Sequence, residues 1–169
     1  MYHLSLKQNI SSVNSIPNLE KVILRANTSK PETLSNLSLA LQVITGQFPK
    51  KNYAKRPLAG FKLKKDQLLG AQITLRKGKM HSFIKNLIFI ILPKFVDFKG
   101  VPKKNLDTQG NIHFGLTQFF LWPQCEVSYE VFRRPSGFHL SLISKGDLKK
   151  KVMIYSYLGL PITEEEIEG

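Results

Sequence analysis

The sequence has a single cysteine, few acidic residues and no long apolar run. Cys125 is the only cysteine among 169 residues, which excludes an internal disulfide bond and a zinc site built from several thiolates. The longest apolar run, Leu87–Leu92, has six residues, whereas a membrane-spanning helix needs about 18. The first twenty residues lack the patterns of a secretory signal and of a transit peptide. We therefore expect a chain that is already mature or is made where it works.

Acidic residues are both scarce and unevenly placed. The chain has 25 Lys and Arg against 12 Asp and Glu, a formal net charge of +13. Four of the acids lie in the last six residues, so residues 1–163 hold every basic residue and only eight acids. A compact body with this excess repels itself unless a polyanion neutralises it, which favours a nucleic-acid partner. We expect an N-terminal arm or short helix (1–20), one domain (21–163) and a disordered acidic tail (164–169).

The basic residues gather between Ile44 and Lys79, a stretch with ten Lys or Arg and one acid, Asp66. Two runs within it, Ala59–Leu63 and Ala71–Arg76, have the composition of strands, and the second alternates apolar and polar residues. A polar link joins the two runs. The pattern predicts a β-hairpin with one face on a core and a cationic face and tip exposed to a polyanion.

Three further segments have clear periodicity. Lys21–Asn27 predicts a strand. Ser29 and Glu32 form a capping box that predicts the start of a helix, and Gly46 predicts its end. The predicted core-facing stripe of this helix comprises Leu34, Leu37, Leu41 and Ile44. A second helix is expected from Gly78 to Pro93, and one predicted buried face comprises Met80, Phe83, Ile84, Leu87, Ile88 and Ile91. Phe89 and Ile90 would widen that face, making this helix the most buried element.

The C-terminal half predicts a long irregular loop (93–110), two strands and a final helix. The strands are Asn111–Trp122, ended by Pro123, and Gly137–Ser144. Asp147 is expected to cap the helix, with Leu148, Val152 and Tyr155 inward and Lys149, Lys150 and Lys151 outward. Hairpins with intervening helices predict an α+β fold, with a largely antiparallel sheet of four to five strands and helices packed on one face.

Residues suited to catalysis are scattered. The four histidines form no i, i+4 pair that could hold a metal from one helix. Cys125 is expected to be a small buried side chain. Asp97 and Asp107 share a lysine-rich loop that would lower their pKa values, which suits a structural role better than acid–base chemistry. We therefore expect no enzyme activity, no cofactor and no metal.

Four segments occur in order along the basic half of the chain: ITGQ from Ile44, AGFK from Ala59, TLRKGKM from Thr74 and PKFVDFKG from Pro93. Together they resemble the bacterial-type L-five family of the large ribosomal subunit, which binds 5S rRNA. The resemblance extends over roughly residues 16–162. It implies a non-catalytic ribosomal protein of the central protuberance.

The resemblance also implies specific RNA contacts. The family contacts 5S rRNA from the end of the first strand, from a Gly-Gln pair and from the Thr of TLR. Gly46, Gln47, Thr74 and Arg76 match directly. The family's LNMGVG is replaced by Leu24–Ser29, which makes Arg25 and Asn27 altered candidates. Basic residues complete the predicted RNA-binding set: Lys50, Lys51, Lys55, Arg56, Lys77 and Lys79.

The resemblance implies functions for two further regions. The hairpin tip, with Lys62, Lys64, Lys65 and Gln67, is implied to face peptidyl-site tRNA. Asp97, Lys99 and Gly100 are implied to face a protein of the small-subunit head across an intersubunit bridge. The expected partners are 5S-type rRNA, large-subunit rRNA, that tRNA, that head protein and neighbouring large-subunit proteins.

Composition suggests a location. Richness in Lys, Asn, Ile and Phe is typical of small AT-rich genomes and favours a mitochondrial ribosome, with a plastid or the bacterial cytoplasm as alternatives. Two other functions stay open: an extra-ribosomal RNA- or DNA-binding module that uses the same hairpin, and a peripheral membrane protein. Only a ribosomal protein would sediment with large subunits in moderate salt.

Overall fold

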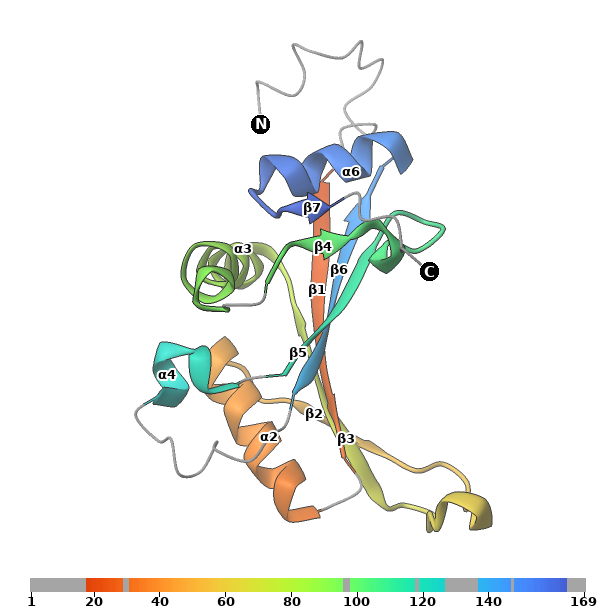
Figure 1. Ribbon diagram of the computed structural model, residues 1–169. Helices are drawn as coiled ribbons and strands as arrows, with labels where there is room; N and C mark the ends of the chain where they lie inside the picture. The colour runs from red at the N-terminus through yellow and green to blue at the C-terminus, as the bar shows by residue number, and fades with distance from the viewer. Residues whose placement is uncertain are drawn as a thin grey trace.

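The computed structural model describes residues 18–28, 31–95, 98–117, 119–126, 137–146 and 148–163. Its main feature is a five-stranded antiparallel sheet with the strand order β2-β3-β1-β6-β5 (Figure 1). The strands are β1 (Asn18–Asn27), β2 (Lys50–Tyr53), β3 (Leu68–Leu75), β5 (Ile112–Leu116) and β6 (Phe138–Lys145). The short strands β4 (Val101–Pro102) and β7 (Ile162–Thr163) form a separate parallel pair. The α+β prediction is confirmed.

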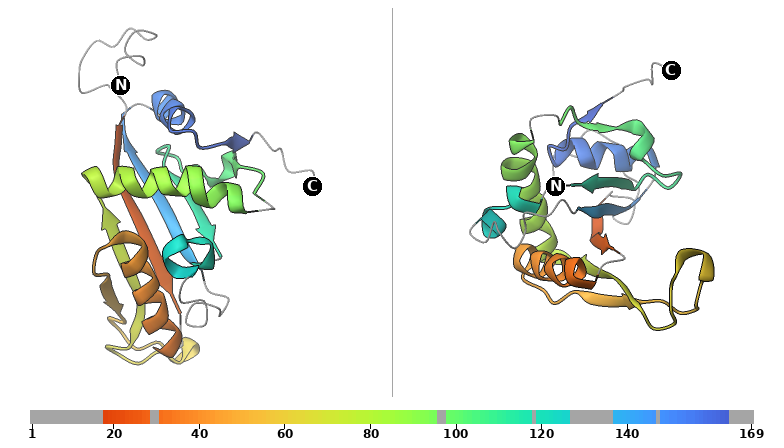
Figure 2. Two further views of the ribbon diagram at one scale, coloured as in Figure 1. Left: turned by 90° about the vertical axis from the view of Figure 1, so that its left-hand side faces the viewer. Right: turned by 60° about the horizontal axis from the view of Figure 1, so that its bottom comes forward.

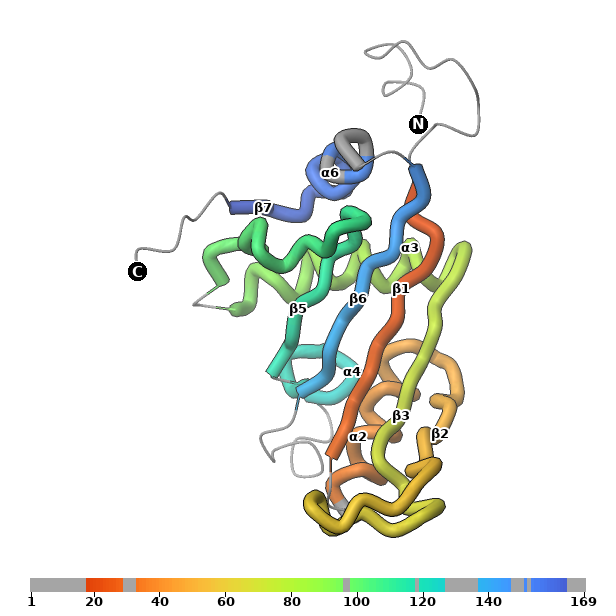
Figure 3. Tube along the Cα trace, turned by 90° about the vertical axis from the view of Figure 1, so that its right-hand side faces the viewer, coloured from red at the N-terminus to blue at the C-terminus, as the bar shows by residue number. Residues whose placement is uncertain are grey.

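Helices cover one face of the sheet. In the left view of Figure 2, α2 (Pro31–Thr45), α3 (Lys77–Asn86) and α4 (Pro123–Glu126) lie in front of the strands. Figure 3, from the opposite side, shows the strands in front of the same helices. The last helix, α6 (Leu148–Tyr157), lies at the end of the sheet where β1 begins. Among the described residues, no helix therefore covers the opposite face of the sheet.

Strand β1 is the centre of the core. Val22, Leu24 and Ala26 are fully buried and alternate along the strand, as a strand with one covered face requires. The register against β6 shifts between Leu19 and Lys21, which adds a residue to β1 at Glu20. This bulge interrupts the period of two, so the predicted strand began at Lys21 whereas β1 begins at Asn18.

The first two predicted helices are present, with one correction. Helix α2 buries Leu34, Leu37 and Leu41 as expected. Helix α3 continues through a π turn (Leu87–Ile91) into a 3₁₀ turn (Leu92–Lys94) that contains Pro93. All six predicted core residues of this segment are buried, but Phe89 and Ile90 are 68% and 41% exposed. The prediction that they widen the buried face was wrong, because they lie on the outer side of the π turn.

The predicted hairpin exists, but its first strand was misplaced. Strand β3 pairs with Lys50–Tyr53, with Lys50 opposite Gln72, and not with Ala59–Leu63. Residues Ala59–Phe61 form a 3₁₀ turn inside the connecting loop. The sequence KKNY has no apolar alternation because β2 is an edge strand, so periodicity could not find it.

The C-terminal half needs two corrections. Strand β5 ends at Leu116, and Pro123 begins helix α4 instead of ending a strand, since proline fits the first turn of a helix. In α6, Tyr155 is buried as predicted, but Lys151 is only 9% exposed and donates a 2.7 Å hydrogen bond from Nζ to the Gln109 carbonyl oxygen. Lys151 therefore ties α6 to the loop before β5 and does not point outward.

Several predictions fall outside the described residues. These are the arm up to residue 17, the Ser29 capping box, the Asp147 cap, the side chains of Leu148, Lys149, Lys150 and Val152, and the acidic tail. Residues 18–20 of the expected arm belong to β1.

The Tyr155 hydroxyl is central to the packing of α6. It is buried, and it lies 3.0 Å from Ser144 Oγ and 3.2 Å from the carbonyl oxygens of Gly110 and Leu142. We expect Tyr155→Phe to lower the free energy of unfolding by about 1–3 kcal/mol in urea titrations, because it leaves buried groups with fewer partners. The control Tyr53→Phe alters a half-exposed hydroxyl and should stay within about 0.5 kcal/mol of the wild type. Equal stability of all three proteins would contradict this role.

Candidate RNA interface

The face of the sheet away from α2, α3 and α4 carries two cross-strand rows of residues. The pairing places Lys50, Gln72, Arg25, His139 and Gly115 side by side across all five strands. Two residues farther along each strand, on the same face, a second row contains Thr74, Ile23, Ser141 and His113. Apart from Ile23 and Gly115, the residues of these rows have polar or cationic side chains, and Figure 3 shows this side of the sheet toward the viewer. We call these nine residues the open face.

Hydrogen bonds between strands hold side chains of the open face in place. Arg25 Nε donates to Gln72 Oε1 at 3.1 Å, which leaves the two terminal nitrogens of the guanidinium to donate elsewhere. At the hairpin end, Asn27 lies directly over Gly70, where a Cβ atom would collide with the Asn27 amide oxygen. Asn27 and Asn52 border an open hollow of about 480 Å³.

His113 connects the open face to a tight turn. Its Nδ1 lies 2.9 Å from Ser141 Oγ, and its Nε2 lies 3.2 Å from Asp107 Oδ2. Asp107 also accepts hydrogen bonds from the backbone amides of Gln109 and Asn111 and from Asn111 Nδ2. Burial by itself would raise the pKa of Asp107, but these hydrogen bonds outweigh it and lower the pKa to about 2. Asp107 is therefore ionised at neutral pH and has a structural role.

The turn between α2 and β2 holds the Gly-Gln pair. Gly46 has a φ of +63°, a left-handed conformation that favours glycine, and its amide donates to the Gln42 carbonyl oxygen at 2.8 Å. From the start of α3, Lys79 Nζ donates to the Gly46 carbonyl oxygen at 3.0 Å. Lys79, predicted to contact RNA, thus also fastens this turn.

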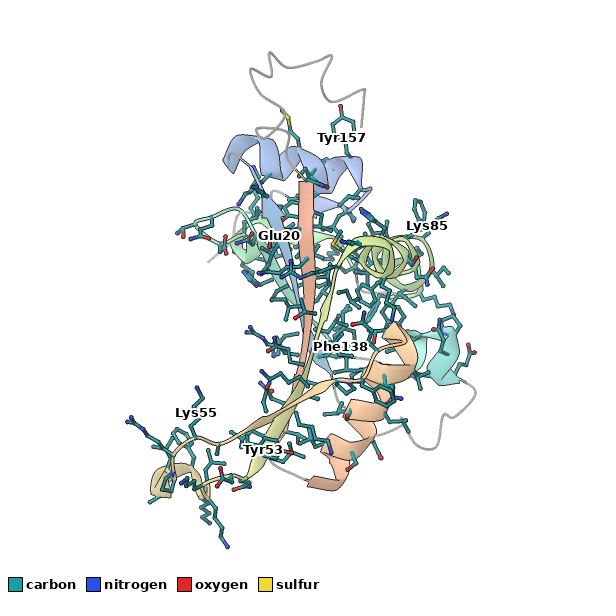
Figure 4. The ribbon with its side chains drawn as sticks, turned by 180° about the vertical axis from the view of Figure 1, so that it is seen from behind. Glu20, Tyr53, Lys55, Lys85, Phe138 and Tyr157 are labelled. Carbon is teal, nitrogen blue, oxygen red and sulfur yellow. The ribbon has the colours of Figure 1, made fainter. Side chains whose placement is uncertain are left out.

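The hairpin extends away from the body of the protein (Figures 1 and 4). Lys62, Lys64 and Lys65 at its tip are exposed, as are Lys55 and Arg56. Gln67 differs from the lysines, because its Oε1 accepts a 3.0 Å hydrogen bond from the Lys64 amide and so shapes the tip. Two antiparallel hydrogen bonds of 3.1 Å join Leu58 and Leu63 and close the tip.

Three other predicted contacts do not lie on the open face. Lys51 pairs with Ala71 on the helix side and lines a groove with Leu34 and Ser38 of α2. Arg76 follows β3, and its Nη1 lies 3.4 Å from Glu20 Oε1. Lys77 is exposed at the start of α3.

The loop before β4 is fixed by the C-terminal strand. Gly100 has a φ of +117°, and a Cβ there would lie 2.7 Å from Thr163 Cγ2. The Val101 amide donates to the Pro161 carbonyl oxygen at 2.8 Å, while Lys99 is exposed. Asp97 lies outside the described residues.

Sites for other chemistry were not found in the part of the chain that the structure describes. Within it, no three His, Cys, Asp or Glu side chains gather closely enough to hold a metal ion, and no helix is long and apolar enough to cross a membrane. Cys125 is fully buried, as predicted, and burial raises the pKa of its thiol to about 11. A thiol with this pKa stays protonated at neutral pH and is a poor nucleophile.

Comparison with known proteins identifies the family. Residues 68–162 match the model of the ribosomal L-five family C-terminus. The large ribosomal subunit protein uL5 of Malacoplasma penetrans is 32% identical over 92% of this chain and 85% of its own. This chain belongs to the uL5 family. The uL5 of Helicobacter pylori strain Shi470 is 29% identical over 95% of this chain and 91% of its own, and the uL5c of Heterosigma akashiwo is 34% identical over 79% and 75%.

Membership in the uL5 family confirms the resemblance found in the sequence. The protein is a structural, non-enzymatic component of the large ribosomal subunit. Gln72, His139 and Ser141 of the open face were not among the predicted contacts. Their alternation with buried residues was visible in the sequence, but only the strand order places them beside Arg25 and Thr74.

The fit of Asn27 over Gly70 can be tested by adding one carbon. In Gly70→Ala the new Cβ would collide with Asn27 and lie 2.8 Å from the Ala26 carbonyl oxygen. We expect a loss of about 1–3 kcal/mol in the free energy of unfolding, as for other overpacked sites. Gly78→Ala is the matched control, since nothing lies within 4 Å of its Cβ position. If both substitutions were harmless, Asn27 would not be held by this contact.

Proposed function

We propose that this uL5 protein binds 5S-type rRNA and the large-subunit rRNA of the central protuberance through its open face and the α2–β2 turn. The supporting observation is a sheet face that no described helix covers, with polar and cationic residues in its cross-strand rows, in a member of a ribosomal protein family. An excess of positive charge in residues 1–163 supplies the long-range attraction to RNA.

The open face suits RNA chemically. Lys50 and the terminal nitrogens of Arg25 are donors for phosphate oxygens, which set the position of the protein on RNA without reading sequence. Gln72, Thr74 and Ser141 offer amide and hydroxyl groups of the kind that bond to ribose 2′-hydroxyls and to base edges. Gly46, Gln47 and Asn27 extend this surface at its margins.

Arg25 changes the character of the proposed contact. The guanidinium carries a charge and cannot accept a hydrogen bond, whereas the asparagine that it replaces in the family's LNMGVG segment both donates and accepts. Arg25 is therefore suited to a phosphate clamp or to stacking on a base. Its bond to Gln72 keeps the guanidinium close to the sheet.

We assign the remaining proposed partners to two loops, the hairpin tip and the loop before β4. Lys62, Lys64 and Lys65 extend from the body on the hairpin and would approach the backbone of peptidyl-site tRNA. Exposed Lys99, on the loop fixed by β7, would face a small-subunit head protein together with Gly100 and Asp97. Neighbouring large-subunit proteins would be the remaining contact partners.

We further propose a mitochondrial ribosome as the location. The support is compositional, from the richness in Lys, Asn, Ile and Phe. A plastid ribosome is the competing location, and the uL5c of Heterosigma akashiwo is among the similar proteins. Co-purification of the protein with mitochondrial or with plastid large subunits separates the two.

Salt dependence tests the proposed RNA binding. If the protein neutralises about six phosphates, the logarithm of its affinity for rRNA should fall with the logarithm of salt concentration at a slope of about −4 to −5. Filter binding with rRNA extracted from the source's large subunits measures this slope. A slope near zero would mean that the positive charge only solvates the surface.

Two variants that each lose three lysines distinguish a role of the hairpin tip in tRNA binding from a role in assembly of the protein into the subunit. The variant with Lys62, Lys64 and Lys65 all changed to Ala should remain in the large subunit but weaken peptidyl-site tRNA binding about two- to tenfold, because exposed contacts are screened. The control changes Lys85, Lys94 and Lys104, three exposed lysines elsewhere, to Ala. Loss of the tip variant from the subunit would show instead that the tip is an rRNA anchor.

A further inference from the structure

The most exposed large apolar side chain in the described part of the chain lies between the Gly-Gln pair and β2. Phe48 is 86% exposed, although burying a phenylalanine side chain is worth about 1.5–3 kcal/mol. Neither the family assignment nor the open face gives a role to this ring. It follows Gln47 directly and precedes Lys50 by two residues.

The backbone around Phe48 is fixed at both ends. Helix α2 ends in the left-handed Gly46, whose amide bonds to Gln42, and β2 begins at Lys50, which pairs with Gln72. Lys79 fastens the Gly46 carbonyl oxygen from α3. Because Pro49 follows Phe48, the backbone of Phe48 is restricted to extended conformations. The ring is thus presented by a short, braced turn, and holding it for a ligand costs little entropy.

The charged residues near Phe48 in the sequence indicate which kind of ligand would contact its ring. No acidic residue lies in the sequence between Glu32 and Asp66, and the turn is followed by Lys50 and Lys51. Exposed Phe89 is a useful contrast, because its neighbour Ile90 is also exposed and the pair suits an apolar protein contact. A single aromatic ring among cations is instead the arrangement on which proteins stack unpaired bases.

We propose that Phe48 stacks on one unpaired base of rRNA, held by the phosphate contacts of neighbouring lysines. This inference rests on the proposed RNA binding and adds a nucleotide class to it: a base turned out of a helix, in a loop or bulge. The ring would be a fixed platform at the β2 edge of the open face. Gln47, one residue away, is in place to contact the same nucleotide.

Three substitutions separate stacking from other roles. Phe48→Leu keeps an apolar side chain but removes the aromatic face, Phe48→Tyr keeps the face, and Phe89→Leu is the control at an exposed ring on the π turn after α3. The probe is rRNA extracted from the source's large subunits, measured by filter binding at low and high salt. Because both sites are exposed and each variant retains a bulky side chain, thermal melts should show unchanged folding.

We expect Phe48→Leu to bind about five- to fiftyfold more weakly, with the same fold-loss at both salt concentrations, because stacking is not screened as phosphate contacts are. Phe48→Tyr and Phe89→Leu should bind like the wild type.

Wild-type affinity of Phe48→Leu, with a steep salt slope retained, would overturn the stacking proposal while leaving RNA binding intact. Normal binding to free rRNA with loss from assembled subunits would overturn it in favour of a protein contact. A wild-type protein that failed to bind rRNA would overturn the proposed function itself, and the stacking proposal with it.

Discussion

The architecture depends on the burial of one face of strand β1. Val22, Leu24 and Ala26 are fully buried at the centre of the sheet, and the adjoining strands β3 and β6 bury Ile73, Leu140 and Leu142 on the same side. Because side chains alternate along a strand, burying these residues necessarily turns Arg25 and its neighbours to the opposite side. The core and the candidate RNA surface are therefore two consequences of a single register.

Two kinds of surface result. The open face is rigid, because its side chains stand on five paired strands and its members are braced by bonds such as Arg25–Gln72. The hairpin is a projection from the body, and its cations are exposed. This division suits the proposed function, in which the sheet fixes the protein on rRNA and the hairpin approaches tRNA, and it is the reason to expect that loss of lysines at the tip leaves assembly intact.

Elements with strong periodicity were predictable from the sequence, and those without it were not. Helix α2 and the buried residues of α3 followed from their apolar spacing. Strand β2, KKNY, did not, because an edge strand made of polar residues has no pattern to detect. The prediction for Phe89 and Ile90 departed from regular helical spacing, because at 3.6 residues per turn Phe89 lies opposite the buried face of the helix and Ile90 lies at its margin. His139 and Ser141 joined the candidate site only through strand order, which is a property of the whole sheet.

The central claim is that the open face of the sheet is the RNA-binding face. A cryo-EM map of the native large subunit containing this protein tests it most directly. The account predicts rRNA against Arg25, Gln72 and Thr74, with α2, α3 and α4 directed away from that RNA. A map in which rRNA covers the helices, while the open face meets solvent or another protein, would contradict it.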